Sequence, residues 1–78
     1  MKKRFKVVFK MAGGTVVKIK EFINPAGVLY CVTQNAPTGA TNVSIEDLEI
    51  KTITTHKLKS RRLPQDDLDG LRAFLGGA

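Results

Sequence analysis

Alternation of apolar and polar residues opens the chain and predicts its first two strands. Over residues 4–11 the odd positions are apolar and the even positions are mostly basic, a period of two that is typical of a half-buried strand. The pair Gly13-Gly14 predicts a turn, because glycine tolerates positive φ. A second alternating segment at residues 16–23 therefore predicts an antiparallel partner strand.

The segment after this hairpin predicts a third strand. Proline at the second position of Asn24-Pro25-Ala26-Gly27 presets φ for a β-turn. Residues 28–34 follow, and their alternation would direct Val28, Tyr30 and Val32 toward the core. We therefore expect the chain to turn at Pro25 and continue the sheet.

The second half of the chain predicts the end of the sheet and one helix. Short strands are expected at about 40–44 and 49–54, separated by one helical turn at 44–48, where the alternation breaks. Residues 64–75 predict an amphipathic helix, because proline stands at its start, acids fill its first turn and apolar residues recur at spacings of three and four. The apolar residues on the shared face of this helix are Leu68, Leu71, Phe74 and Leu75.

Together these elements predict a mainly β fold: a small five-stranded antiparallel barrel or strongly bent sheet with a short C-terminal helix. The 78-residue chain would form a barrel at 1–55, a basic connector at 56–63 and the helix with a glycine-rich end at 64–78, all within one domain. A chain of this length buries only about 60% of its unfolded surface. We therefore expect a small core and no small-molecule substrate.

Three segments resemble the small five-stranded barrels of the Src-homology type, which include Tudor-like and KOW-like domains. They are Gly14-Thr15-Val16-Val17-Lys18-Ile19, Gly27-Val28-Leu29-Tyr30-Cys31-Val32 and Ser44-Ile45-Glu46-Asp47-Leu48-Glu49-Ile50. Members of these families bind RNA, DNA, modified peptides or other proteins. The resemblance therefore implies a binding module and leaves the ligand open.

The excess of positive charge favours a nucleic-acid ligand. Thirteen Lys and Arg residues oppose seven Asp and Glu residues, which gives a net charge of +6 and a pI of about 9.8. In the expected hairpin register Lys10 would lie opposite Lys18, and RNA or DNA bound across this face would relieve their repulsion. The residues expected to contact the nucleic-acid backbone are Lys6, Lys10, Lys18, Lys20, Lys57, Lys59, Arg61 and Arg62.

A protein-interaction or assembly module, such as an inhibitory accessory protein of a phage or mobile element, is the alternative. The expected strands would direct Val8, Phe22, Leu29 and Cys31 to an outer face, and an exposed apolar patch needs an explanation. We expect Leu68, Leu71, Phe74 and Leu75 to cover it within the same chain. A protein partner or a second copy of the chain could cover the same patch.

The sequence offers little for catalysis. His56 and Cys31 are each the only residue of their kind, and the expected fold separates them. No metal-binding pattern is present, so we expect neither an enzyme nor a cofactor. A single cysteine forms no intrachain disulfide, and no stretch is apolar enough to span a membrane. These features together predict a cytoplasmic protein without a membrane partner.

Overall fold

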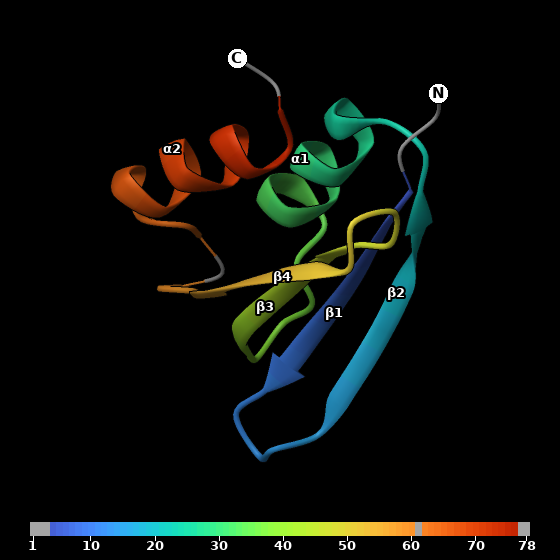
Figure 1. The fold of residues 1–78 in the computed structure, drawn as a ribbon. Coiled ribbons are helices and arrows are strands. Elements are labelled where there is room, and N and C mark those ends of the chain that lie inside the picture. The colour runs from blue at the N-terminus through green and yellow to red at the C-terminus, as the bar shows by residue number, and fades with distance from the viewer. Residues whose placement is uncertain (1–3, 61, 77–78) are drawn as a thin grey trace.

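The computed structural model describes residues 4–60 and 62–76, with the backbone alone at 18–20. The elements follow the order β1, β2, α1, β3, β4 and α2 (Figure 1). Their bounds are β1 Phe5–Met11, β2 Val16–Phe22, α1 Pro25–Gln34, β3 Ala40–Asp47, β4 Thr52–Lys57 and α2 Gln65–Phe74. In the described part of the chain, no helix is long and apolar enough to cross a membrane.

The strands form one open antiparallel sheet in the order β2-β1-β3-β4. The sheet twists, so that β4 runs at an angle across the direction of β1 and β2 (Figure 1). The prediction of a mainly β fold with a C-terminal helix is confirmed. Among the described residues the sheet is not closed into a barrel, and four strands rather than five make it up.

The predicted third strand at 28–34 is wrong, because this segment belongs to helix α1. Asn24 is the N-cap, and its Oδ1 accepts a hydrogen bond from the Gly27 amide at 2.7 Å. Pro25 occupies the first turn, where its missing N–H costs no helical hydrogen bond. Val28, Cys31 and Val32 are buried at helical spacing, whereas Tyr30, expected inside, is 62% exposed. The second segment of the barrel resemblance is therefore helical.

The predicted helical turn at 44–48 is also wrong. Strand β3 continues to Asp47, and the turn occupies the residues after it. The Asp47 carboxylate accepts hydrogen bonds from the Glu49 and Ile50 amides at 2.9 and 3.4 Å, a local pattern that favours a turn over a continued strand. The last strand consequently spans 52–57 instead of 49–54.

Both helices cover the same face of the sheet (Figure 1). The core lies between the two helices and the central strands. It consists of Phe5, Val7, Phe9, Val28, Cys31, Val32, Ala36, Ala40, Val43, Ile45, Leu71 and Leu75. Phe22, Leu29 and Phe74 are partly buried and pack against this cluster, and Leu68 is half-buried. Helix α2 thus packs within the chain, against the main core.

The separate outer patch expected from Val8, Phe22, Leu29 and Cys31 does not form. Its last three members lie on the core side, because α1 replaces a strand and Phe22 pairs with Phe5. Val8 alternates with the buried Val7 and Phe9 and belongs to the opposite face of the sheet. That opposite face, which no helix covers, is called the open face below.

Candidate functional site

The open face is a grid of three rows that the strand register defines. Each row crosses β2, β1, β3 and β4 in turn. The first row holds Val16, Lys10, Asn42 and Lys57; the second holds Lys18, Val8, Ser44 and Thr55; the third holds Glu21, Lys6, Glu46 and Ile53. Directly paired residues are neighbours on one face of an antiparallel sheet, so the rows show which charges lie together.

Lys6 lies in the row that contains the acids. Its two cross-strand partners are Glu21 and Glu46, an arrangement of opposite charges that stabilises the sheet. Arg4 donates to Glu21 at 2.7 Å, and this hydrogen bond raises the pKa of the Arg4 guanidinium. Lys6 is also half-buried. Lys6 therefore lies between two carboxylates that offset its charge.

The predicted pairing of Lys10 with Lys18 is wrong. Lys10 pairs with Val16, and Lys18 pairs with Val8. A bulge between Val7 and Val8 shifts the register within the hairpin. Lys20 pairs with Val7 in the backbone register, but the side chains of Lys18 and Lys20 lie outside the described part of the structure.

The first row carries positive charge without acidic neighbours. Asn42 pairs with Lys10 on one side and with Lys57 on the other, and both lysines are exposed. Neither this row nor the second contains an Asp or Glu residue. In the second row the Ser44 and Thr55 hydroxyls share a hydrogen bond of 3.2 Å. The first two rows therefore contain basic and uncharged residues, and acidic residues enter the face only in the third row.

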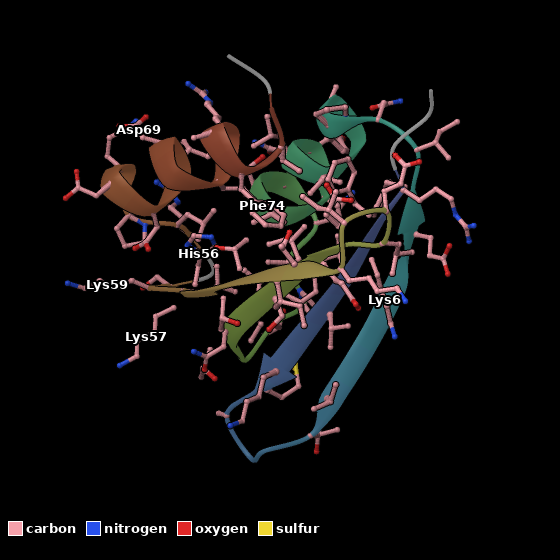
Figure 2. All side chains as sticks on the ribbon, in the orientation of Figure 1. Lys6, His56, Lys57, Lys59, Asp69 and Phe74 are labelled. Atoms are coloured by element: carbon pink, nitrogen blue, oxygen red, sulfur yellow. The ribbon has the colours of Figure 1, made fainter. Side chains whose placement is uncertain are left out.

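The described residues of the predicted basic connector extend the sheet. Lys57 belongs to β4, and the Leu58 amide donates to the Thr41 carbonyl at 2.8 Å. Lys59 and Arg62 then pair through two backbone hydrogen bonds of 2.8 and 3.0 Å. Figure 2 shows Lys57 and Lys59 projecting from this end of β4, whereas Lys6 lies toward the other end of the strand, beside β2. We call Lys10, Lys57, Lys59 and Arg62 the basic end; the predicted Arg61 lies outside the described residues.

A groove runs between the end of α1 and the turn after β4. It consists of two adjoining hollows of about 280 and 310 Å³ that share Thr33, Gln34 and Arg62. Ala36 and Ser60 complete the first hollow, and Leu63 and Leu68 complete the second. Among the described residues that line this groove, none is acidic. The sequence interpretation missed Thr33, Gln34 and Ser60, because it assigned residues 28–34 to a strand and expected no pocket.

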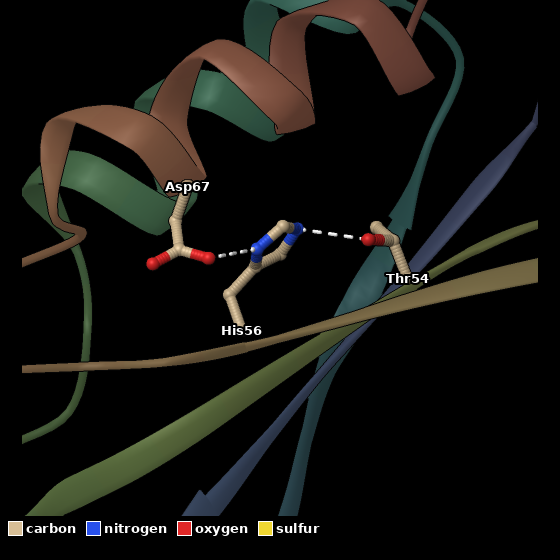
Figure 3. Close-up of polar contacts among 3 residues, drawn as sticks. All are labelled: Thr54, His56 and Asp67. Carbon is tan, nitrogen blue, oxygen red and sulfur yellow. Dashed lines mark hydrogen bonds and ion pairs between the residues drawn. The ribbon is translucent and has the colours of Figure 1, made fainter.

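A second polar cluster joins β4 to α2 (Figure 3). His56 is buried, and its Nδ1 and Nε2 lie 3.1 Å from Asp67 Oδ1 and 2.9 Å from Thr54 Oγ1, respectively. A hydroxyl, an imidazole and a carboxylate in this order match the arrangement of a nucleophilic triad. None of the three residues lines either hollow of the groove. We therefore interpret this cluster as a structural link.

Neither a metal-binding cluster in the described part of the chain nor a similar protein indicates a function for this chain. Among the described residues, no group of three His, Cys, Asp or Glu side chains could hold a metal ion. No family model, curated protein or solved structure matches this chain.

Proposed function

We propose that this protein binds nucleic acid, with the basic end holding backbone phosphates. The observation that carries the proposal is the row in which Lys10 and Lys57 flank Asn42 on an open sheet face. Lys side chains attract phosphates and release counterions when they bind them. The amide of Asn42 and the hydroxyls of Ser44 and Thr55 add uncharged groups of the kind that bind phosphate and sugar oxygens.

The separation of charge supports the same ligand. Three of the acids, Asp66, Asp67 and Asp69, belong to α2, which covers the opposite face of the sheet. Figure 2 shows Asp69 on the other side of β4 from Lys57. Glu21 and Glu46 are confined to the third row. A polyanion at the basic end would thus meet lysines before it meets carboxylates, which favours association through long-range electrostatic attraction.

The test compares two double variants that remove the same charge. Lys10→Ala with Lys57→Ala removes the basic row, and Lys51→Ala with Arg72→Ala removes two exposed cations elsewhere. Anisotropy titrations of labelled RNA and DNA oligomers at about 50 and 200 mM salt give each affinity and salt slope. Loss of two phosphate contacts should flatten the slope of log affinity against log salt by about 1.4–1.8. An equal loss in the control variant would contradict the proposed interface.

A protein-interaction module is the second candidate, because apolar side chains flank the same face. Val16 and Ile53 are 60% and 62% exposed, and they stand at the two edge strands of the open sheet. Edge strands and exposed apolar residues are sites where a partner or a second copy can dock. A dimer whose size-exclusion volume is unchanged between low and high salt, together with absent oligomer binding, would favour this candidate.

A further inference from the structure

We infer that the groove between α1 and the turn after β4 receives one unstacked nucleotide, so that this protein prefers single strands. The inference rests on the proposed function and adds the form of its ligand. It depends on three features of the groove: one cation, a polar wall and an apolar wall. Each feature matches a different part of a nucleotide.

Arg62 supplies the cation. It is exposed, and it lines both hollows of the groove. A guanidinium group presents a planar set of donors that fits the oxygens of a phosphate. Ser60 in the first hollow adds a hydroxyl that can donate to the same anion. Because no described lining residue is acidic, nothing in this wall opposes a phosphate.

Gln34 and Thr33 form the polar wall on α1. The Thr33 hydroxyl donates to the Leu29 carbonyl at 2.7 Å, so its oxygen remains able to accept a second hydrogen bond. The exposed Gln34 amide offers both a donor and an acceptor. A glutamine amide binds the edge of adenine through both groups. Thr33 and Gln34 together therefore suit the hydrogen-bonding edge of a base.

Leu63 and Leu68 form the apolar wall. Both are half-buried and line the second hollow, so they offer an apolar surface to the face of a base. Each hollow, of about 280 or 310 Å³, is near the lower end of the ~300–1,000 Å³ range of ligand pockets. Space of this size suits one base rather than a base pair. A base enters such a space only when it is unstacked, as in single strands.

The groove and the basic end share Arg62. Arg62 pairs with Lys59 through the backbone, and the β3–β4 ladder continues from there to Lys57, Asn42 and Lys10. Strands in a sheet are about 4.8 Å apart, so crossing from β4 to β1 takes roughly 10 Å. A short oligomer with one nucleotide in the groove would pass around the β4 edge of the sheet to reach the lysines of the first row on the open face.

The experiment compares single-stranded and duplex octamers of the same sequence, using Gln34→Ala and Arg62→Ala. Gln65→Ala and Arg72→Ala are the controls, since they remove the same residue types at exposed positions of α2. We expect the unmodified protein to prefer the single strand. Gln34→Ala should weaken single-strand binding about tenfold and leave duplex binding unchanged. Arg62→Ala also removes a cation of the basic end, so it should weaken binding to both forms, and binding to the single strand more. Gln34→Ala should also reduce any preference for oligo-adenylate over oligo-thymidylate.

Two results would overturn the inference in distinguishable ways. If Lys10→Ala with Lys57→Ala weakens binding while both groove variants bind single strands normally, the groove is not a nucleotide site and the proposed function stands. If no oligomer binds even at low salt, both proposals are wrong. Circular dichroism and thermal unfolding of every variant show whether a loss of affinity reflects a loss of fold.

Discussion

His56 on β4 and Asp67 on α2 are held 3.1 Å apart, Nδ1 to Oδ1, across the boundary between sheet and helix. His56 is only 8% exposed. Because an ionised carboxylate only accepts, Nδ1 carries the proton of this hydrogen bond. In the neutral ring Nε2 then accepts from the Thr54 hydroxyl, and both imidazole nitrogens are satisfied. The link fixes the start of α2 beside β4.

We expect Asp67→Ala to lower the free energy of unfolding by about 1–3 kcal/mol, because it leaves the buried His56 N–H without an acceptor. Asp67→Asn should cost less, since its amide oxygen can still accept. Asp66→Ala is the control, because Asp66 is an exposed acid in the same first turn. Urea unfolding followed by circular dichroism gives the three values. Equal losses for Asp66→Ala and Asp67→Ala would mean that only the charge near the helix start matters.

Replacement of Asn24 tests why α1 is a helix. Asn24→Ala should destabilise the protein by about 1 kcal/mol, because it removes the acceptor of the Gly27 amide. Asn24→Asp keeps an oxygen at the same position and should retain most of the stability. Thermal unfolding midpoints of the two variants supply the comparison. If both variants had the same unfolding midpoint as the unmodified protein, the side-chain cap would contribute nothing to the stability of the helix.

Tyr30 and Val32 distinguish the helix from the strand that the alternation predicts. Tyr30→Ala should change the unfolding free energy by less than about 0.5 kcal/mol, because its side chain is largely exposed. Val32→Ala should cost roughly 2 kcal/mol, because it removes two fully buried methyl groups. Denaturant titrations measure both. In a strand with both residues facing inward, the two losses would be similar.

Lys6 and Lys10 lie on the same strand but have different cross-strand neighbours, so their replacement should affect nucleic-acid binding differently. Lys10→Ala should weaken nucleic-acid binding, whereas Lys6→Ala should weaken it less, because Lys6 lies between Glu21 and Glu46. Lys6→Ala should instead lower the unfolding free energy by about 0.2–1 kcal/mol through loss of cross-strand pairing. Anisotropy and urea unfolding on the same samples give both values. Equal losses of affinity would contradict a mixed-charge third row.

The local sequence pattern was enough to predict β1, its hairpin with β2 and the helix α2. The alternation in residues 4–11 predicted the strand β1, and the glycine pair predicted its hairpin with β2. The spacing of Leu71 and Leu75 predicted the buried face of α2. In each case the period of the apolar residues directly reflects the geometry of the element.

Helix α1 shows where a short pattern is ambiguous. Val28 and Val32 fit both the period of a strand and the spacing of a helix. Their β-branched side chains favour a strand, and packing against the sheet overrides that weak preference. Two features distinguish the helix from a strand. Asn24 before Pro25 suits the start of a helix as well as a turn. Cys31 is buried together with Val28 and Val32, a spacing of three and four that fits a helix, whereas a strand with Val28 and Val32 inside would direct Cys31 outward.

The sequence by itself determined the excess of positive charge, the first hairpin and the amphipathic C-terminal helix. Only the tertiary structure decided which charges are neighbours, because a bulge of one residue changes every later pairing along a strand. It also placed Gln34 and Arg62 around the same groove and brought His56 beside Asp67. Such contacts join segments distant along the chain, and no local period encodes the packing that creates them.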